Sequence, residues 1–542
     1  WRSLDTGFSV EYWSKAIWLF HDSPTLTEAF LQKYYESMIL QAEHIMECHS
    51  AYRYMSNWGV IENHGLFEIG VCLPQSEKTK QFIAFAVKNL EVQVRMQIMP
   101  DGVHWEQSPM YHNEVLHCLL DVILLAKRND IALPDVILRQ TEKMAMADVA
   151  WLKPDHHIVM MGDSDDVDVR DRISVAAYLF LNPVLRFGGF DRLDYESIWD
   201  LGMKAGEEYA GMERRKPDFT SLFLEHSGNT YFRSDWSERA NFLHLHSGTM
   251  GAGHGHSDKL HIDLVVNGED VLMDGGRYTY VSGPKRFSYK DPSGHNTITV
   301  DDLPFTVCKD SWECSKLSQP VKENFRCTKL AEFAQAGQLG YMDLPGGVYV
   351  NRKVVYIKPD LYVLADEMYT GDRHTYQQYF HFNNHGTVTQ NAPGEKKFPC
   401  VAYRGKMAET DFYFVSAQVK AELKSGHIAR HYNVEEENTV CKVTKQGEGF
   451  TSLITVIDAQ PGRPLSIEKL PVRSALKQTD YPETMAEALK ITAGEKEYVV
   501  ILCHQEVNSP TDLVEVDGCM GYGNVIVFDK AGDVLVGDVL NW

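Results

Sequence analysis

The sequence predicts an α+β multidomain protein, in which a helical N-terminal domain precedes antiparallel β-sandwich domains. Apolar residues recur every three or four positions through the first 200 residues, the spacing of amphipathic helices. From about residue 218 the spacing changes to two, the period of a strand with one buried face. We therefore expect a helical domain at 1–210, a β-sandwich at 218–390 and a further β-sheet region at 391–542.

Four helices can be assigned in the N-terminal part. The first is predicted to start at Ser23-Pro24, because Thr25 and Glu28 have the spacing of a capping box. Its apolar stripe consists of Phe30, Tyr34, Met38, Ala42 and Ile45. The other three are marked by Phe82, Phe85, Leu90 and Val94, by the segment 109–128 and by the segment 134–151. Consecutive helices with short breaks are typical of an α/α toroid or of a helix bundle, and the pattern leaves both open.

The clearest strands lie on either side of two turn signals. Apolar residues alternate from Leu260 to Val266, and the alternation resumes at Val271 after Asn267-Gly268. Asn-Gly between alternating apolar runs is a strong hairpin signal. The runs 348–357 and 361–364 flank a Lys-Pro-Asp turn in the same way. Strands separated by such turns predict a large antiparallel sandwich.

Composition and charge restrict the possible functions. The chain has 542 residues, of which 44% are hydrophobic and 24% charged, as in an ordinary globular protein. No run of 18 apolar residues is present, so we expect no membrane insertion. Lys and Arg number 53 against 75 Asp and Glu, a net charge of −22 that argues against nucleic-acid binding. A polyanionic ligand would then need a local cationic cleft.

Cysteine usage is that of a chain without a disulfide scaffold. Ten cysteines are scattered through the sequence, and none forms a CxxC pair. We expect mostly free, buried thiols, which favour a reducing compartment.

A group of histidines precedes the 260–266 strand. On a strand, His254 and His256 would share a face, while Asp274 ends the partner strand and His295 follows nearby. Two imidazoles and a carboxylate are suitable ligands for zinc or a similar ion. The alternative is that glycine-flanked histidines are ordinary loop residues.

Two segments of the helical half also carry reactive side chains. We expect Asn63 and His64 to lie beside a helix start, where they would either line a cleft or cap the helix. Tyr111 falls in the first turn of the helix that begins near Pro109. A tyrosine there is either reactive or a core aromatic with its hydroxyl satisfied.

Taken together, these segments resemble the heparinase II/III-like polysaccharide lyases, including the heparinase III and oligoalginate lyase branches. The motifs that carry the resemblance are RSLDTG at 2–7, NHGLFE at 63–68, DGVHWEQSPMYH at 101–112, GDSDDVDVRD at 162–171, YFRSDWSERANFLHLHSG at 231–248, GHGHSDKLHIDLVVNGEDVLMDGGRYTY at 253–280 and GHNTITVDD at 294–302. The resemblance implies an N-terminal α/α toroid followed by antiparallel β-sheet domains, and a secreted or periplasmic protein. Relatives carry more helical sequence before the asparagine motif, so we expect the toroid to be incomplete at its start.

The resemblance also implies a role for individual residues. Tyr111 matches the family's acid, which is often also the base, and Asn63 with His64 matches the group that neutralises the substrate carboxylate. His254 matches an active-site histidine. The metal ligands, usually of zinc, correspond to His256, Asp274 and His295. Substrate contacts are expected from Glu106, Tyr280 and Tyr289.

The implied reaction is β-elimination on an acidic polysaccharide. It removes the C5 proton next to a uronate carboxylate, and an amide and an imidazolium at that carboxylate would stabilise the developing charge. A tyrosine with a pKa of about 10 is a poor base at neutral pH unless cations favour the phenolate. It can also act as the acid that protonates the leaving O4.

Three other functions remain open at this level. A glycoside hydrolase of acidic glycans would need two carboxylates across the bond, and Glu62, Glu68 and Glu106 are the candidates. An alginate-type lyase and a catalytically inactive glycan-binding protein are the others. The segment 106–112 looks more like the glycosaminoglycan-acting branch, which favours a glycosaminoglycan substrate.

Overall fold

The computed structural model describes residues 1–392, 394–530 and 535–541, which divide into two compact units. The helical unit comprises Trp1–Leu152 and Val167–Pro217. The sheet unit comprises Lys153–Asp166 and the chain from Asp218 onward. The short segment Lys153–Asp166 therefore belongs to the sheet unit, although helices precede and follow it in the sequence.

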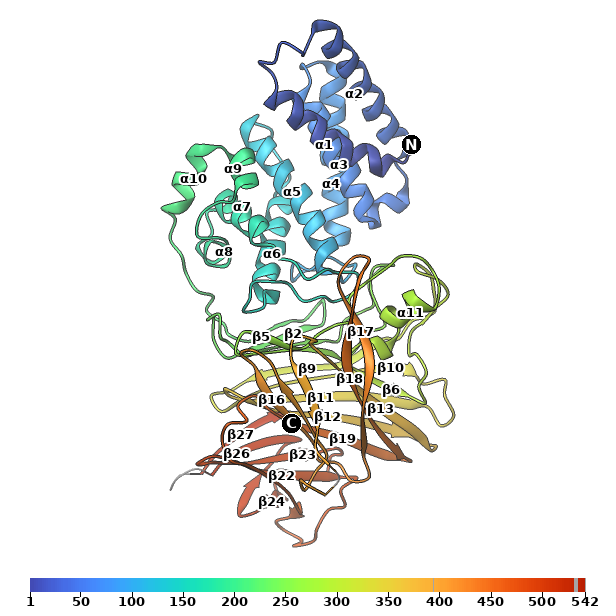
Figure 1. Ribbon diagram of the computed structural model, residues 1–542, viewed down its shortest axis with the longest axis vertical. Helices are drawn as coiled ribbons and strands as arrows, with labels where there is room; N and C mark the ends of the chain where they lie inside the picture. Colours follow the sequence, from blue (N-terminus) through green and yellow to red (C-terminus); the bar gives the residue numbers. More distant parts are fainter. Residues whose placement is uncertain (393, 531–534, 542) are drawn as a thin grey trace. The chain divides into compact units, whose positions relative to one another are not determined.

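The helical unit contains the helices α1–α10, most of which run alongside one another (Figure 1). Their bounds are α1 Ser3–Leu19, α2 Glu28–Cys48, η1 Ala51–Met55, α3 Asn57–Cys72, α4 Glu77–Gln97, α5 Pro109–Arg128, α6 Asp135–Trp151, α7 Arg170–Phe180, α8 Pro183–Gly188, α9 Tyr195–Leu201 and α10 Met203–Ala210. None of the described helices is long and apolar enough to cross a membrane.

The helix predictions are confirmed, with two corrections at N-termini. Helix α5 begins at Pro109, and α6 begins at Asp135 after Pro134, as expected. The first predicted helix starts later than Ser23-Pro24, because the side chain of Thr27 accepts a hydrogen bond from the Phe30 amide and caps α2. Similarly, α3 starts at Asn57, well before the predicted start.

The sheet unit is built from stacked antiparallel sheets (Figure 1). Sheet I has the order β1 (Leu222–Leu224), β2 (Asn229–Arg233), β3 (Phe242–His246), β4 (His261–Val266), β5 (Glu269–Leu272), β13 (His374–Phe382), β18 (Val434–Gly447), β17 (Lys420–His431), with β6 (Ile298–Val300) paired to β13. Sheet II has the order β14 (Thr387–Gln390), β15 (Cys400–Arg404), β16 (Glu409–Phe414), β19 (Phe450–Asp458), β12 (Leu361–Thr370), β11 (Val348–Ile357), β10 (Ala331–Tyr341), β9 (Pro320–Cys327). Sheet III has the order β20 (Leu465–Leu470), β22 (Ala486–Ala493), β23 (Lys496–Cys503), β26 (Val525–Asp529), β27 (Val536–Asn541).

Smaller elements complete this unit. A small sheet contains β21 (Arg473–Ser474), β24 (Val514–Val516) and β25 (Cys519–Gly521), and a short hairpin contains β7 (Val307–Cys308) and β8 (Cys314–Lys316). Helices α11 (Pro284–Lys290) and η2 (Pro292–Gly294) lie between β5 and β6 in the sequence.

Alternating side chains join these sheets into layers. Along β11, Val354 and Tyr356 contribute to the core shared by sheets I and II, whereas Val355 and Ile357 contribute to the core shared by sheets II and III. Successive residues of a strand point to opposite faces, so sheet II is buried on both sides. The expected sandwich is therefore confirmed, with sheet II in its middle.

Both predicted turns are present. Asn267 and Gly268 have φ values of 50° and 80°, as a two-residue type I′ turn requires, and they join β4 to β5. The second hairpin pairs Ile357 with Leu361 across the end of β11 and β12. The boundary predicted at residue 390, between the β-sandwich and the further β-sheet region, stays a prediction. In sheets I and II, strands that precede this residue pair with strands that follow it.

Candidate active-site residues and metal centre

A fully buried carboxylate, Asp163, organises the histidines of the sheet unit. Its Oδ2 accepts from His254 Nδ1 at 3.0 Å, and its Oδ1 accepts from His256 Nε2 at 2.8 Å. The guanidinium of Arg286 contacts both oxygens, at 2.6 Å from Nη1 to Oδ1 and 2.9 Å from Nη2 to Oδ2. One side chain therefore holds two histidines and an arginine in place.

The charge on Asp163 is stabilised by these contacts. Burial raises the pKa of Asp163, but the hydrogen bonds to His254 and His256 and the charge of Arg286 lower it well below its usual range. The carboxylate is therefore ionised at neutral pH. An ionised acceptor requires a proton on each nitrogen that faces it.

This requirement sets the tautomer of both rings. Neutral His254 donates from Nδ1, so its lone pair lies on Nε2, the form of a general base. Neutral His256 donates from Nε2, so its lone pair lies on Nδ1. Burial lowers the pKa of His256 to about 3, which keeps that ring neutral and able to bind a metal.

The two histidines reach Asp163 from a loop and not from a strand. We predicted that strand alternation would place them on one face, but β4 starts only at His261. The loop is close-packed at Gly255, where an added Cβ would lie 1.5 Å from the carbonyl oxygen of Met250. Glycine at this position therefore allows the loop to turn tightly between the two imidazoles.

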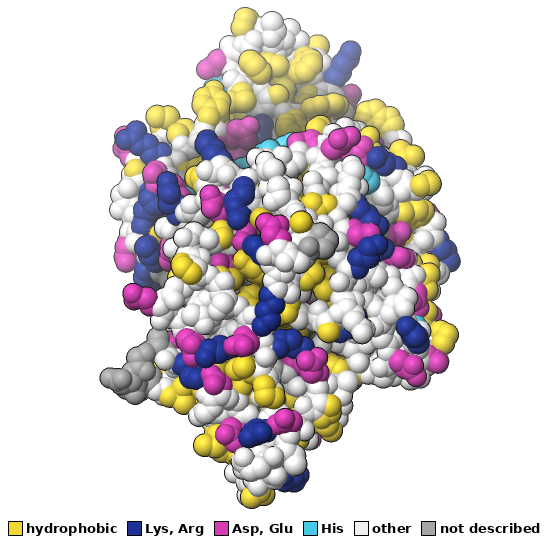
Figure 2. All heavy atoms as spheres, turned by 60° about the horizontal axis from the view of Figure 1, so that its bottom comes forward, with side chains coloured by type: hydrophobic (Ala, Val, Ile, Leu, Met, Phe, Trp, Pro, Cys, Tyr) yellow, Lys and Arg dark blue, Asp and Glu magenta, His cyan; other side chains and the backbone are white. Residues whose placement is uncertain are grey.

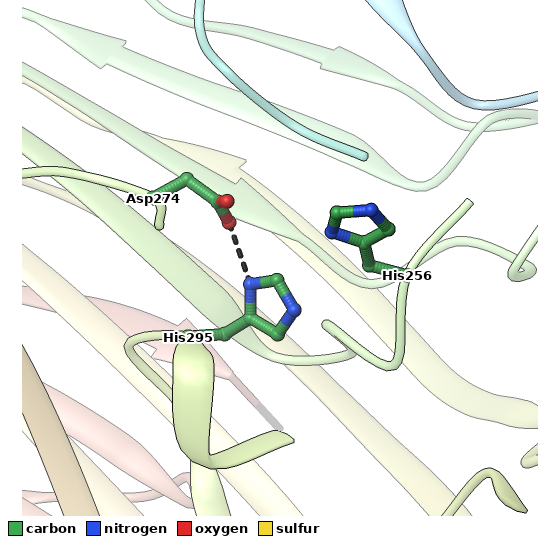
Figure 3. Close-up of side chains that lie close together, drawn as sticks. All are labelled: His256, Asp274 and His295. Carbon is green, nitrogen blue, oxygen red and sulfur yellow. Dashed lines mark hydrogen bonds and ion pairs between the residues drawn. The ribbon is translucent and has the colours of Figure 1, made fainter. Parts of the chain in front are cut away.

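The predicted metal ligands lie together in the sheet unit. His256, Asp274 and His295 each offer a ligand atom, and these atoms lie within 4.8 Å of one another. Figure 3 shows the three side chains, with the hydrogen bond of 2.7 Å between His295 Nδ1 and Asp274 Oδ2. All three side chains are buried.

The unused nitrogens of this group are consistent with a metal ion. His256 Nδ1 and His295 Nε2 are buried and have no hydrogen-bond partner among the described residues. Buried ring nitrogens usually have a partner, and an imidazole that donates one N–H to a carboxylate is the usual arrangement of a metal ligand. Asp163 has this role for His256, whereas Asp274, itself one of the three possible ligands, lies 2.7 Å from His295 Nδ1.

Aromatic side chains lie beside His254. The ring of Trp312 stacks on Tyr280 at 5.1 Å between centroids and meets His254 edge-on at 5.3 Å. Trp312 is 52% exposed and belongs to the turn between β7 and β8. The Tyr280 hydroxyl accepts from Arg277 Nη1 at 2.8 Å. The predicted role of Tyr280 in substrate binding is compatible with this position.

Tyr289 lies differently. Its side chain is fully buried, and its hydroxyl donates to Glu435 Oε1 at 2.7 Å. Burial and then Glu435 raise the pKa of Tyr289. These contacts do not favour the predicted substrate contact, because the phenol is already used inside the sheet unit.

In the helical unit, Glu106 connects two helix starts. Asn57 Nδ2 donates to both carboxylate oxygens of Glu106, at 3.1 and 2.9 Å, and the Asn57 amide N–H donates to Oε1 at 3.3 Å. A carboxylate at the N-terminus of α3 is favoured by the helix dipole. Tyr111 follows five residues later in the first turn of α5, with a partly exposed side chain.

Asn63 and His64 lie in the middle of α3 and are buried. Asn63 Nδ2 donates to the Gly59 carbonyl at 2.7 Å, and Asn63 Oδ1 accepts from Asn89 at 3.4 Å. His64 Nε2 lies 3.3 Å from Asp121 Oδ2. The structure does not favour their predicted role at the substrate carboxylate, because both side chains bind groups inside the helical unit.

The sequence reasoning missed Asp163, Asn57 and Trp312. Asp163 belongs to the 162–171 motif, and Asn57 follows Ser56, whose side chain caps α3. A serine before an apolar helix is a recognisable cap and was the available signal for Asn57. No local pattern marks the contact of Asp163 with a histidine 91 residues away.

Two family models match the chain. Heparinase II/III N-terminus matches residues 1–183, and Heparinase II/III-like, C-terminal matches residues 216–463. The chain belongs to the heparinase II/III family. The resemblance inferred from the sequence motifs is thereby confirmed.

Curated relatives of this heparinase II/III-family chain are lyases. A heparin-sulfate lyase of Pedobacter heparinus is 25% identical over 333 residues, covering 58% of this chain and 46% of the relative. A heparin-sulfate lyase of Bacteroides stercoris is 21% identical over 313 residues, covering 56% and 44%. The chain thus spans about half the length of the curated relatives it matches.

Solved structures show the same fold. A heparan sulfate lyase from Pedobacter heparinus superposes with a TM-score of 0.71 at 19% identity, covering 94% of this chain and 75% of that chain. A heparinase III crystal structure gives a TM-score of 0.74 at 16% identity, with coverages of 93% and 75%. The predicted toroid-plus-sandwich class is therefore confirmed for this heparinase II/III-family chain.

The acidic excess of the chain does not gather on the surface shown in Figure 2. Acidic and basic side chains are interspersed on that face. The net charge of −22 therefore does not produce a single acidic patch there that would repel a polyanion.

Proposed function

We propose that this protein is a polysaccharide lyase that cleaves a uronate-containing glycosaminoglycan by β-elimination. The observation that carries the proposal is the 3.0 Å contact between His254 Nδ1 and the buried carboxylate of Asp163, which favours the tautomer with its lone pair on Nε2. The curated relatives named heparin-sulfate lyases support the reaction and the substrate class.

In this proposal His254 takes a proton from C5 of the uronate. That proton is weakly acidic, because its removal places charge next to an existing carboxylate. The base must therefore be oriented and neutral before the substrate binds. Asp163 meets the first condition by holding Nδ1–H, and it stabilises the imidazolium that forms.

Tyr111 supplies the acid. A phenol with an ordinary pKa of about 10 is protonated at neutral pH and can donate to the leaving O4. The first turn of α5 holds it, and Pro109 and Ser108 fix where that turn begins. On a substrate of the opposite C5 configuration, Tyr111 would act as base as well.

Asn57 replaces Asn63 in our proposal for the group at the substrate carboxylate. Asn57 is the first residue of α3 and donates to Glu106, five residues before Tyr111 in the sequence, whereas Asn63 lies in the middle of that helix. An amide N–H at the carboxylate lowers the cost of charge that develops there. Glu106 then acts by orienting Asn57.

A divalent metal ion, most simply zinc, fits the group of His256, Asp274 and His295. When bound, it would cross-link the loop of His256 to the segments after β5 and before β6. The neighbouring residue His254 would be ordered by the same loop. Chain residues alone carry the proton steps in this proposal.

The function is tested with a panel of polysaccharides: heparan sulfate, heparin, chondroitin sulfate, hyaluronan and alginate. Elimination leaves an unsaturated uronate, which absorbs in the ultraviolet. The product is lighter by one water than the product of hydrolysis at the same bond. We expect this product from a glycosaminoglycan. Saturated products would instead indicate a hydrolase, and binding without any product would indicate a glycan-binding protein.

The metal assignment is tested separately by elemental analysis and thermal unfolding. His256→Ala and Asp274→Ala should each lose the ion and lower the melting temperature. A matched control is His381→Ala, a buried histidine of β13 outside the group. Equal metal content in all three variants and the wild type would contradict the assignment.

A further inference from the structure

A second group of titratable side chains lies inside the helical unit, on helices α1, α3 and α5. His64 and Glu68 are one turn apart on α3, and His117 and Asp121 are one turn apart on α5. Residues four apart in a helix lie on the same face. Glu11 of α1 completes the group, which we call the helical cluster.

The helical cluster contains two overlapping sets of possible ligands that share Asp121. In one set, ligand atoms of His64, Glu68 and Asp121 lie within 4.8 Å of one another, and in the other so do atoms of Glu11, His117 and Asp121. The members of the first set are all buried. Histidine nitrogen and carboxylate oxygen together suit a divalent transition-metal ion.

Glu68 is the member that points to a ligand. Its Oε2 is buried and has no hydrogen-bond partner among the described residues, and the whole residue is only 2% exposed. An unpaired buried carboxyl is costly, so a residue of this kind usually has a partner. Glu68 and Asp121 both line a cavity of about 430 Å³ that would admit a small ion and water.

Four carboxyl groups lie around the cavity. Lys15 Nζ lies 2.9 Å from Glu11, 3.2 Å from Asp200 and 3.7 Å from Asp121. One ammonium thus serves the carboxylates of Glu11, Asp121 and Asp200, and Glu68 adds a fourth carboxyl group. Burial lowers the pKa of His64 and His117, but acidic neighbours outweigh burial and raise it, and burial raises the pKa of Glu68 to about 8. Protons therefore balance the buried group unless a bound cation takes their place.

The separation of His64 and Asp121 is compatible with a pair of ligands as well as with a long hydrogen bond. His64 Nε2 and Asp121 Oδ2 are 3.3 Å apart, longer than the roughly 2.7–2.9 Å of a charge-assisted hydrogen bond. Two ligands at about 2.1 Å from a tetrahedral ion lie roughly 3.4 Å from each other. The separation therefore fits two ligands of one ion.

We propose that the helical unit binds a divalent transition-metal ion, such as zinc or manganese, through His64, Glu68 and Asp121. Glu68 has to rotate toward the other two ligands when the ion binds. The ion takes the place of protons on the ligand side chains, and Lys15 remains the partner of Glu11 and Asp200. This site is separate from the group of His256, Asp274 and His295, and its existence does not depend on lyase activity.

The proposal is tested by counting metal equivalents. The full chain is stripped with a chelator, reloaded with zinc or manganese, freed of excess ion and analysed for bound metal. We expect two equivalents in the wild type. Glu68→Gln, which keeps the shape but removes the charge, should lose one equivalent, and Asp274→Ala should lose the other.

A matched control is available on the same helix. Glu62 of α3 is also buried and its Oε2 also has no partner among the described residues, but its Oε1 is paired with Ser3 and Arg53. It belongs to neither set of possible ligands in the helical cluster, so Glu62→Gln should keep both equivalents. Equal metal content in Glu68→Gln and Glu62→Gln overturns the proposal and leaves protons as the source of positive charge. If Glu68→Gln does not fold, the metal content of Asp274→Ala decides. One bound equivalent in that variant supports the site in the helical unit, and no bound metal overturns it.

Discussion

Asp163→Asn is the substitution that tests the organisation of the histidines most directly. It preserves the shape of the side chain but replaces one of its two acceptor oxygens by an N–H donor. The two oxygens now serve different histidines, Oδ1 for His256 and Oδ2 for His254. In either orientation of the amide, one histidine therefore faces a donor and must change its tautomer.

The magnitude follows from these contacts. If the amide nitrogen faces His254, the lone pair of that ring moves to Nδ1 and the base is lost from Nε2. Removal of a positioned general base lowers turnover by about 10²–10⁴, or about 2.7–5.4 kcal/mol in activation free energy. If it faces His256, Nδ1 becomes the protonated nitrogen and metal affinity falls. Arg286 loses its buried counter-charge in both cases, which costs about 3–5 kcal/mol of unfolding free energy.

The assay must separate these effects from simple destabilisation. Asp366 forms an equally buried pair with Arg352, at 2.7 Å from Nε and 2.8 Å from Nη2, and contacts no histidine. Asp366→Asn should therefore lower the free energy of unfolding by a similar amount, yet leave turnover of the folded fraction near wild type. Turnover and metal content both unchanged in folded Asp163→Asn would refute the reasoning.

Three further outcomes are expected. Tyr111→Phe should lower turnover by about 10²–10⁴ while substrate affinity, measured by calorimetry, stays near wild type; retained turnover would contradict the role of the phenol. Burial lowers the pKa of His504, but its hydrogen bonds to acidic side chains, Glu367 first, outweigh burial and raise it. The ion pair therefore contributes its full stability below about pH 6.5, the pKa of histidine in the unfolded chain, and this contribution is lost as pH rises through the pKa in the folded protein. The difference in unfolding free energy between wild type and His504→Gln should shrink from pH 6 to 9. A constant difference would argue against a charged imidazole. Cys308 and Cys314 are register partners in β7 and β8, within the Cα separation that a disulfide needs, so glutathione disulfide should link them; peptide mapping that finds both thiols free would refute this.

Much of the fold could be predicted because it depends on local patterns. The change of apolar period near residue 218 separates helices from strands. In the described structure the last helix before this change is α10, Met203–Ala210, and the first strand is β1, Leu222–Leu224. The hairpin at Asn267-Gly268 was predictable because few residues accept positive φ at two successive positions. The stacking of three sheets was not, since a strand buried on both faces shows only that it is apolar throughout.

The candidate site could be predicted only where the ligands are close in sequence or in a hairpin. His256, Asp274 and His295 come together as expected, because the β4–β5 hairpin brings its two ends to the same place. Asn63 was predicted from the resemblance of its motif, and the sequence did not show that α3 begins six residues earlier, at Asn57, and buries Asn63 in its middle.

The contribution of Asp163 depends on an excursion of the chain that no periodicity reveals. Between α6 and α7 the segment Lys153–Asp166 leaves the helical sequence and packs with the sheet unit. Lys153 is held by Asp166 and Asp270, at 3.1 and 2.8 Å, and Met160 packs with Met273 and Ile428. A long connection without regular structure is usually functional, and this one places the carboxylate of Asp163 among the buried side chains of His254, His256 and Arg286. The position of Asp163, and with it the tautomers of both histidines, therefore depends on how this segment is anchored to the sheet unit. Lys153 is one of these anchors and lies outside the sequence motifs, so substitutions at Lys153 should lower turnover without touching a reacting group.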